Sequence, residues 1–395
     1  MNNSPLQTVA ADMELDVHRR LSHLETWREA WREEDETLMA HLETLEAGRW
    51  LDLQRGVQIA GLRRRLTLQL VQHPLEVSAE AVRLVGFPGL RQHLAAQFAG
   101  LTQAERLLWL NNFLFILTPD LRQLSDKITR VRAHQTLGQQ RNFLLGGLSG
   151  MGKSTYLNWL ALNERPVVET ERNRVPVIKI DAPVSNLTPK PLFQRILMEC
   201  GATYTAADNE EILLMKLILF LQRCRTELLI VDEVEHITRP DLRRRILEIS
   251  NLTHGLPIVC ASCHPLRWIE GDTEVQGRWN DYFELRQYTG QRLHRLLAFL
   301  ELLLPFTGDA FLADHMLLPA SKEGRQMDGP ARLIEQWTGG ILRDIMLLVL
   351  EASTRAIRHN MSHLTPLLLE ETWRDIQTSQ VTDFLAVLRR NGGRQ

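Results

Sequence analysis

The stretch that decides the fold runs Gly147-Leu148-Ser149-Gly150-Met151-Gly152-Lys153-Ser154-Thr155. It fits the pattern G-x-x-x-x-G-K-[ST], in which glycines let backbone N–H groups point toward the phosphates of a nucleotide. In this pattern Lys153 reaches the β and γ phosphate oxygens, and the Ser154 hydroxyl binds Mg²⁺. A short apolar run at 142–145 precedes the loop and a helical pattern at 156–162 follows it. The order strand, loop, helix predicts that residues 147–155 bind ATP or GTP.

A second stretch, Leu228-Leu-Ile-Val-Asp-Glu233, is a continuous apolar run that ends in two carboxylates. Such a run is typical of a buried parallel strand whose carboxyl end meets a ligand. Asp232 is then expected to hold Mg²⁺, mostly through water, and Glu233 to polarise the attacking water. The alternative is a buried strand followed by a solvated acidic turn. The phosphate loop upstream favours the nucleotide site.

Composition places the chain among ordinary globular proteins. It has 395 residues, 44% hydrophobic and 24% charged, which leaves room for two or three domains. A formal net charge of −2 excludes a global attraction to nucleic acid, so any such binding must come from a local patch. The N-terminus lacks a basic region followed by an apolar core, and the longest apolar runs are too short to cross a bilayer. We therefore expect a cytoplasmic protein with no membrane partner.

Apolar runs alternate with helical patterns through the middle of the chain. Strands are expected at 142–145, 175–181, 228–233, 256–262 and 282–285. Helices are expected at 94–117, 121–134, 192–200, 210–223 and 239–251. This alternation predicts an α/β fold with a parallel sheet, while the patterns before and after it are helical.

Two further patterns allow more than one interpretation. Cys260-Ala-Ser-Cys-His264 matches a haem-attachment sequence and half a zinc site, but also two small apolar residues of a buried strand, which we favour. Four cysteines give no disulfide framework. Arg63-Arg64-Arg65 could grip phosphates or form a solvated helix face, and we favour the solvated face.

The acidic pair at 232–233 and the lack of an Asn-Lys-x-Asp guanine motif favour ATP over GTP. Segments 232–237, 256–262, 277–280 and 337–344 resemble those of initiator-like AAA+ ATPases. Within that group the chain resembles the TniB/TnsC transposition regulators, over roughly residues 118–360. The resemblance implies an AAA+ P-loop fold with a five-stranded parallel sheet, a small α-helical lid and an all-helical N-terminal appendage. ATP and Mg²⁺ are the implied cofactors.

This resemblance implies four segments: a helical N-terminal region at 1–117, a nucleotide-binding core at 118–288, a lid at 289–365 and a C-terminal helical extension at 366–395. It also implies roles for single residues. The polar residue that senses the γ-phosphate falls at Ser262 or Cys263. Arg278, before Trp279, matches an arginine that reaches the γ-phosphate of a neighbouring subunit. Arg343 fits the second sensor position.

In TniB/TnsC-like proteins the region around the second strand lines a channel that follows a DNA backbone. The basic residues of this region are Arg172, Arg174, Lys179 and Lys190. They are candidate DNA contacts, although each could equally be an ordinary ion-paired or solvated side chain.

The resemblance implies a regulator that forms a ring or helical homo-oligomer on double-stranded DNA when ATP is bound. Hydrolysis would disassemble the oligomer, and the expected partners are a transposase and a target-selector protein. One alternative is another initiator-like motor or loader in replication or secretion, which shares every motif. Another is a STAND-type signalling NTPase, although the repeat arrays usual in that class are not found in this sequence.

Overall fold

The fold is described from a computed structural model. It describes residues 17–22, 75–76, 92, 94–112, 116–133, 142–164, 167–168, 173–184, 188–199, 202, 204–205, 207–307, 312 and 329–392. These residues form two compact units. The α/β unit contains the described residues from 119 to 286, and the helical unit contains those of 1–26, 73–118 and 287–395.

The α/β unit is built on a five-stranded parallel sheet with the strand order β6-β7-β8-β3-β9. Its strands are β3 (Asn142–Gly146), β6 (Val177–Asp181), β7 (Leu228–Asp232), β8 (Ile258–Ala261) and β9 (Trp279–Glu284). The predicted α/β fold with a five-stranded parallel sheet is confirmed. One strand, β8, separates the strand before the phosphate loop from the acidic strand β7.

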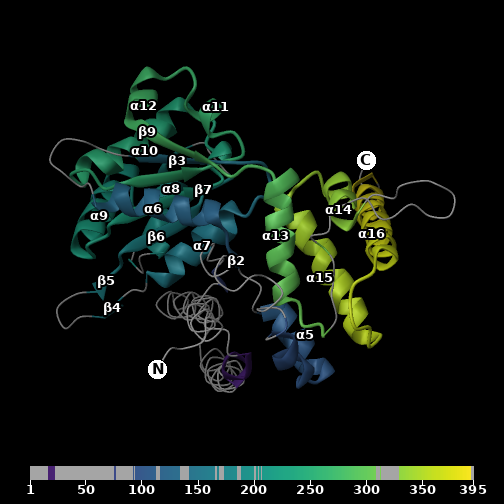
Figure 1. The fold of residues 1–395 in the computed structure, drawn as a ribbon. Coiled ribbons are helices and arrows are strands. Elements are labelled where there is room, and N and C mark those ends of the chain that lie inside the picture. Colours follow the sequence, from purple (N-terminus) through teal and green to yellow (C-terminus); the bar gives the residue numbers. More distant parts are fainter. Residues whose placement is uncertain are drawn as a thin grey trace, which may run out of the picture. The chain divides into compact units, whose positions relative to one another are not determined.

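Helices cover both faces of this sheet (Figure 1), which explains why β3, β7 and β8 are buried along their whole length and largely apolar. One face packs in a common core with α8 (Lys190–Glu199), α9 (Glu210–Arg223) and α10 (Pro240–Leu252). Ile178 and Ile180 of β6 and Cys260 of β8 belong to that core. The helices α6 (Pro119–Ala133) and α7 (Lys153–Asn163) contact β3 and β6 respectively. Because side chains alternate along a strand, Lys179 lies on the face opposite to its two isoleucine neighbours.

The start of α9 shows how the sequence sets a helix boundary. The side chain of Asn209 accepts a hydrogen bond from Ile212 N at 2.9 Å, which caps the first turn. The predicted bounds of this helix, 210–223, agree with the structure.

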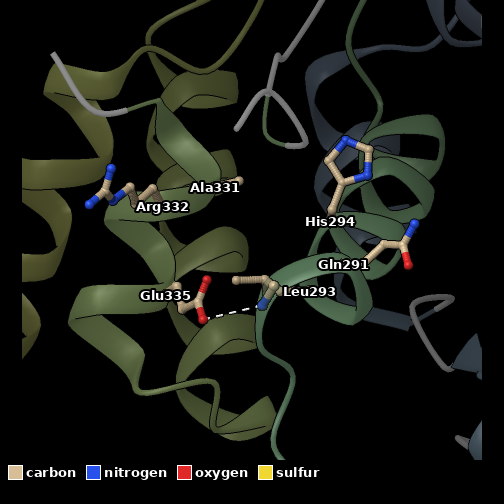
Figure 2. Close-up of a pocket in the computed structure, with 7 residues that line it drawn as sticks. Gln291, Leu293, His294, Ala331, Arg332 and Glu335 are labelled. Atoms are coloured by element: carbon tan, nitrogen blue, oxygen red, sulfur yellow. Dashed lines mark hydrogen bonds between the residues drawn. The ribbon is translucent and has the colours of Figure 1, made fainter. Parts of the chain in front are cut away.

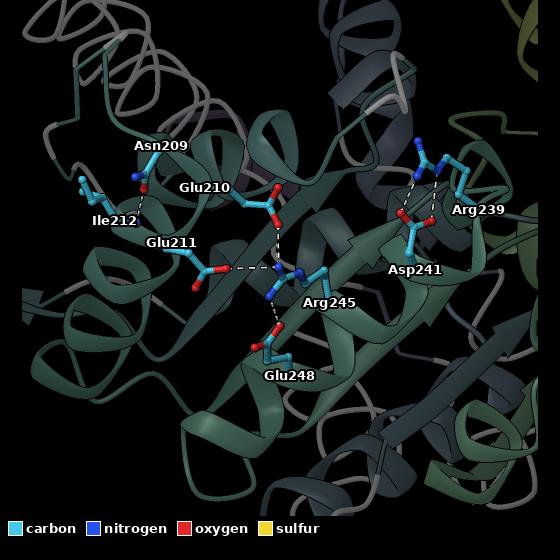
Figure 3. A network of polar contacts seen from close by, with 8 residues as sticks. All are labelled: Asn209, Glu210, Glu211, Ile212, Arg239, Asp241, Arg245 and Glu248. Atoms are coloured by element: carbon cyan, nitrogen blue, oxygen red, sulfur yellow. Dashed lines mark hydrogen bonds and ion pairs between the residues drawn. The ribbon is translucent and has the colours of Figure 1, made fainter.

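Ion pairs join the start of α9 to α10. Arg245 of α10 pairs with Glu210 and Glu211 of α9 at 2.9 and 3.2 Å, and with Glu248 of its own helix at 2.6 Å (Figure 3).

Several short elements of the α/β unit were not predicted. They are the antiparallel pair β4 (Val167–Val168) and β5 (Asn173–Arg174), the 3-10 turn η1 (Val234–His236), and the helices α11 (Pro265–Ile269) and α12 (Thr273–Arg278). None of them is long enough to produce a hydrophobic period in the sequence.

The helical unit combines segments from both ends of the chain. Its helices are α5 (Gln103–Asn112), α13 (Gly290–Leu303), α14 (Pro330–Thr338), α15 (Leu342–Arg358) and α16 (Pro366–Gly392). The indole Nε1 of Trp109 donates to Leu303 O at 2.9 Å, and Gln103 Nε2 donates to Ile357 O at 2.9 Å. A segment that precedes the sheet in sequence therefore packs with helices that follow it. The four predicted segments, with boundaries at 117, 288 and 365, stay a prediction.

The prediction of one helix over 94–117 is wrong. Helix stops after residue 99, restarts as α5, and ends before β2 (Ile116–Leu117), which pairs in parallel with β1 (Leu75–Glu76). The restart is a capping box: Glu105 N donates to Thr102 Oγ1 at 3.3 Å, and Thr102 N donates to a Glu105 carboxylate oxygen at 2.7 Å. The hydrogen bond from Thr102 N lowers the pKa of Glu105. The N-terminal region is accordingly not helical throughout.

No helix in the described part of the chain is both long and apolar enough to cross a membrane.

Candidate nucleotide-binding site

The phosphate loop leaves the carboxyl end of β3 and enters α7. Gly147, Gly150 and Gly152 have φ angles of 142°, 81° and 87°, which favour glycine at each position. A Cβ atom on Gly147 would lie 2.7 Å from Leu285 O, just beyond the end of β9. The loop therefore packs tightly against the neighbouring strand, and its first glycine is required by space as well as by conformation.

Lys153 is the first residue of α7, and only 8% of it is exposed. Its Nζ donates to Gly147 O at 2.5 Å and to Leu148 O at 3.1 Å, so the side chain folds back over the loop. Ser154 and Thr155 are exposed at the first turn of the same helix. The N-terminal N–H groups of α7 and the Lys153 ammonium thus converge where a phosphate would bind.

Asp232 is the last residue of the acidic strand β7 and is 1% exposed. Its Oδ1 accepts a hydrogen bond from Glu233 N at 2.9 Å. Its Oδ2 is buried and accepts no hydrogen bond within the described residues. A buried carboxylate oxygen that accepts no hydrogen bond, with Lys179 Nζ 3.6 Å away, fits Mg²⁺, which prefers hard oxygen ligands.

The small number of candidate protein ligands also fits Mg²⁺. No cluster of three or more His, Cys, Asp or Glu side chains that could hold a metal occurs in the described ranges. Mg²⁺ in nucleotide sites commonly takes one or two protein ligands and completes its shell with phosphates and water. Asp232 and the hydroxyl of Ser154 would supply that protein share.

Glu233 follows Asp232 with a left-handed backbone, φ 56° and ψ 38°. Its side chain is 54% exposed, and its Oε2 lies 3.7 Å from His236 Nε2. A glutamate in this conformation is strained, and such strain often occurs at functional sites. The turn aims this carboxylate away from the core while Asp232 stays buried.

The two candidates for the γ-phosphate sensor differ in their surroundings. Ser262 is buried, and its Oγ accepts a hydrogen bond from His264 N at 3.1 Å. Cys263 is partly exposed, and its Sγ lies 3.8 Å from Lys153 Nζ. Burial raises the pKa of the Cys263 thiol, which keeps it protonated near neutral pH. Of the two, Cys263 is the one placed beside the phosphate loop.

Arg278 is the last residue of α12 and is exposed. Trp279, which follows it, is buried and packs edge-on against Trp268 with ring centroids 5.3 Å apart. Asp272 caps the start of α12, because its Oδ1 accepts from Val275 N at 3.3 Å. The tryptophan anchor and the cap together hold Arg278 at the surface of the α/β unit.

Arg343 belongs to the helical unit, where it is the second residue of α15. Its side chain is exposed, and its Nε donates to Asp344 Oδ1 at 3.0 Å. Gly340, just before this helix, has a φ of 75°, and a Cβ there would lie 2.5 Å from Tyr288 O. The sensor role of Arg343 stays a prediction.

The predicted DNA contacts occupy different environments. Lys179 is largely buried, pairs with Asp181 and lies 3.6 Å from Asp232 Oδ2. Arg174 pairs with Glu227, which also binds Arg132 at 2.6 Å. Both residues are ion-paired, and their role as DNA contacts stays a prediction.

The remaining basic candidates are distributed differently. Lys190 is partly exposed at the first residue of α8. Arg172 and the triplet 63–65 lie outside the described residues.

Sequence reasoning missed one neighbour of the site, because it did not place Lys179 beside Asp232. Cys263, which lies beside Lys153, was one of the two predicted sensor candidates. The signal for Lys179 was its position two residues before the end of a buried strand that pairs with β7, which becomes visible only once the strand order is known.

A separate hollow of about 580 Å³ lies in the helical unit between α13 and α14 (Figure 2). Gln291 and His294 line it from α13, and Arg332 and Glu335 from α14. Glu335 Oε1 accepts a hydrogen bond from Gly290 N at 3.2 Å and so joins the two helices. No residue predicted to bind nucleotide or DNA lines this hollow.

Comparison with known proteins gives one family and several similar folds. Residues 106–287 match the family model described as bacterial TniB protein. This segment includes the phosphate loop, Asp232, Glu233 and Arg278. No curated protein sequence matches the chain.

Solved structures with a similar arrangement of elements include the ORC1 protein of Aeropyrum pernix in complex with DNA. It is 17% identical, with 72% of each chain covered and a TM-score of 0.49. Cdc6p of Pyrobaculum aerophilum is 12% identical, with 64% of this chain and 66% of that chain covered and a TM-score of 0.45. The RuvB Holliday junction branch migration motor of Thermotoga maritima is 15% identical, with 64% and 67% covered and a TM-score of 0.40.

Proposed function

Because residues 106–287 match the family model described as bacterial TniB protein, we propose that the chain is an AAA+ ATPase that regulates DNA transposition in an ATP-dependent manner. In this proposal it assembles as a ring or helical homo-oligomer on double-stranded DNA and links a target-selector protein to a transposase. The observation that carries the proposal is the family match over a segment that also contains a complete phosphate loop and acidic strand.

The site supports nucleotide binding through charge. The Lys153 ammonium and the first N–H groups of α7 would neutralise the β and γ phosphates, with Lys153 exchanging its present carbonyl partners for phosphate oxygens. Mg²⁺, held by Asp232 and Ser154 when bound, supplies electrostatic stabilisation of the charge that develops on the γ-phosphate. The protonated Cys263 thiol lies close to Lys153 Nζ, so it could also contact the γ-phosphate that Lys153 would bind.

Hydrolysis would use residues from two subunits. Glu233 is an exposed carboxylate beside Asp232, suited to orient a water for in-line attack on the γ-phosphate and to accept its proton. Arg278 is exposed and anchored by Trp279, so a neighbouring subunit could receive its guanidinium. A reaction that requires both residues would occur only in the assembly and would then reset it.

Electron microscopy of the full chain tests this function. The samples contain a non-hydrolysable ATP analogue, with and without duplex DNA, and the matched control is Lys153→Ala. The proposal expects rings or filaments of the unmodified protein that require both ligands, and none from the control.

Rings that form with nucleotide alone and ignore DNA would overturn the DNA-assembling role and favour a motor or signalling ATPase. Assembly of the Lys153→Ala protein on DNA would show that the phosphate loop does not govern the process.

A further inference from the structure

A buried cation lies directly beside the proposed Mg²⁺ ligand. Strands β6 and β7 pair in parallel with Lys179 opposite Ile230 and Asp181 opposite Asp232. The pairing continues to the strand ends, where Ala182 N donates to Asp232 O at 2.8 Å. Residues in register on parallel strands share a face, and so do residues two apart on one strand. Lys179 and the two aspartates therefore lie together on one face of the sheet.

The contacts show that Lys179 is shared between the two carboxylates. Its Nζ forms an ion pair with Asp181 Oδ1 and lies 3.6 Å from Asp232 Oδ2. The side chain of Lys179 is 10% exposed and that of Asp181 is 44% exposed. Arg195 of α8 donates to the main-chain oxygen of Asp181 at 2.8 Å and leaves the carboxylate to Lys179. The ammonium thus has one solvent-facing partner and one buried partner.

This placement has a consequence for metal binding. A divalent cation at Asp232 Oδ2 would be repelled by a unit charge a few ångströms away, and this repulsion is strong in a poorly solvated site. Without that charge, two carboxylates at adjacent strand ends would attract a divalent cation by themselves. The hydrogen bond to Asp181 gives the ammonium a place to remain when Asp232 engages a metal.

We propose that Lys179 is a positioning residue that keeps Asp232 from binding a divalent cation until nucleotide arrives, and that it then pairs with Asp181 alone. The proposal rests on the proposed function, because Asp232 is taken as the Mg²⁺ ligand. In this arrangement Mg²⁺ enters with the phosphates of ATP, and the protein does not hold the metal in their absence.

The first test measures Mn²⁺ binding to the full chain by electron paramagnetic resonance without nucleotide. The variants are Lys179→Met and Asp181→Asn. The control is Lys216→Met, which removes another lysine paired with an aspartate, at 2.6 Å from Asp208. Removal of the charge beside Oδ2 should tighten Mn²⁺ binding by at least about tenfold in Lys179→Met. The control and Asp181→Asn should bind no more tightly than the unmodified protein.

The second test measures the Mg²⁺ concentration at which a fluorescent ADP analogue is half-maximally bound. Lys179→Met should need less Mg²⁺, because the competing charge is gone. Asp181→Asn should need more, because Lys179 then has only Asp232 as a carboxylate partner. Opposite shifts support positioning by Lys179, whereas shifts in the same direction would mean a merely structural role and overturn the proposal.

Two outcomes separate this proposal from the proposed function. If Lys179→Met binds Mn²⁺ no more tightly than the unmodified protein, the role of Lys179 is refuted, whatever the ATPase activity. If the unmodified protein binds no nucleotide, the proposed function falls, and the Mn²⁺ titration still decides the role of Lys179. Should Lys179→Met fail to fold, the Asp181→Asn shift alone decides, since Asp181 is partly exposed and its replacement keeps the buried lysine.

Discussion

Single residues of the phosphate loop are already arranged for an anion. Lys153 Nζ donates to two carbonyl oxygens of its own loop, at 2.5 and 3.1 Å, so the side chain already lies over the loop and would exchange these partners for phosphate oxygens. Preorganisation of this kind reduces the entropy lost on binding. The same side chain is largely buried, which strengthens its interaction with charge.

Replacement of this ammonium tests the loop directly. Lys153→Ala should weaken ATP binding by about 2–3 kcal/mol, roughly 30- to 150-fold, because a charge-assisted hydrogen bond to phosphate is lost. Isothermal titration calorimetry gives the affinity, and Lys216→Ala serves as a control for loss of one positive charge. Unchanged affinity in Lys153→Ala would remove the nucleotide site from this loop.

The carboxylate of Glu233 permits a different separation, between binding and chemistry. Glu233→Gln should bind ATP normally but hydrolyse it roughly 10²- to 10⁴-fold more slowly, because the amide cannot accept the proton of the attacking water. Steady-state phosphate release measures the rate, and the exposed Glu270→Gln is the control. Turnover at the normal rate would place the catalytic base elsewhere.

For single residues, the sequence was sufficient to predict those site residues that lie close together along the chain. The loop from Gly147 to Thr155 and the pair Asp232-Glu233 are local patterns, and their roles stay predictions that the geometry suits. The surroundings of Lys179 depend on which strand pairs with β6 and in which register, so a linear pattern could not separate a DNA contact from an ion pair.

Among the secondary-structure elements, the junction of β3 and β8 depends on one side chain. Asn142 is the first residue of β3 and is fully buried. Its Oδ1 accepts a hydrogen bond from Ile258 N, at the start of β8, at 3.0 Å. The amide thus satisfies a backbone donor that the ladder leaves unpaired at its edge.

Loss of this acceptor should destabilise the sheet. Asn142→Ala leaves the Ile258 N–H buried without a partner and should cost about 1–3 kcal/mol of unfolding free energy. Urea unfolding followed by circular dichroism measures the change, with the exposed Gln222→Ala as the control. Equal stability of the two variants would show that water or another group replaces the asparagine.

Long elements were predictable and short ones were not. Strands β3, β7 and β8 are buried along their whole length, so the sequence shows each as a largely apolar run. Strands β6 and β9 include partly exposed polar residues, and their apolar signal is weaker. Strands β1 and β2 have two residues each, and their pairing joins positions 75 and 116. The break in the helix at residues 100–102 was missed because the sequence on both sides of it has a helical pattern. The only local signal for the restart is the capping box of Thr102 and Glu105.

For the whole molecule, the proposed ATPase is complete only as an oligomer. Arg278 sits at the exposed end of α12, and its proposed target belongs to another subunit. Arg278→Ala should therefore lose most hydrolysis alone, by roughly 10³-fold or more. Mixing it with Glu233→Gln, which keeps its arginine, should restore activity at sites that combine an intact glutamate with a neighbour's arginine.

The control for this complementation is the exposed Arg267→Ala, which should hydrolyse ATP normally without a partner. Phosphate release across a series of mixing ratios measures the rescue. Absence of rescue at every ratio would mean that Arg278 does not act between subunits.

The order of the chain does not reveal how the helical unit is assembled. Trp109 and Leu303 are joined by a hydrogen bond although the whole α/β unit lies between them in sequence. Hydrophobic periodicity predicts that each helix exists, but it does not say which helices pack together. That knowledge came from the three-dimensional contacts alone.

At residue 233 the requirements of stability and of the proposed activity conflict. A left-handed conformation suits glycine, and any other side chain there is strained by about 1–2 kcal/mol. We expect the free energy of unfolding of Glu233→Gly to exceed that of Glu233→Ala by about 0.5–1 kcal/mol. This difference is smaller than the backbone strain because an unfolded glycine has more conformational freedom than an unfolded alanine. Both variants lack the proposed catalytic carboxylate, so chemical denaturation is the measurement that ranks them. Thermostabilisation of this protein would therefore favour replacement of Glu233, the residue on which the proposed ATP hydrolysis depends.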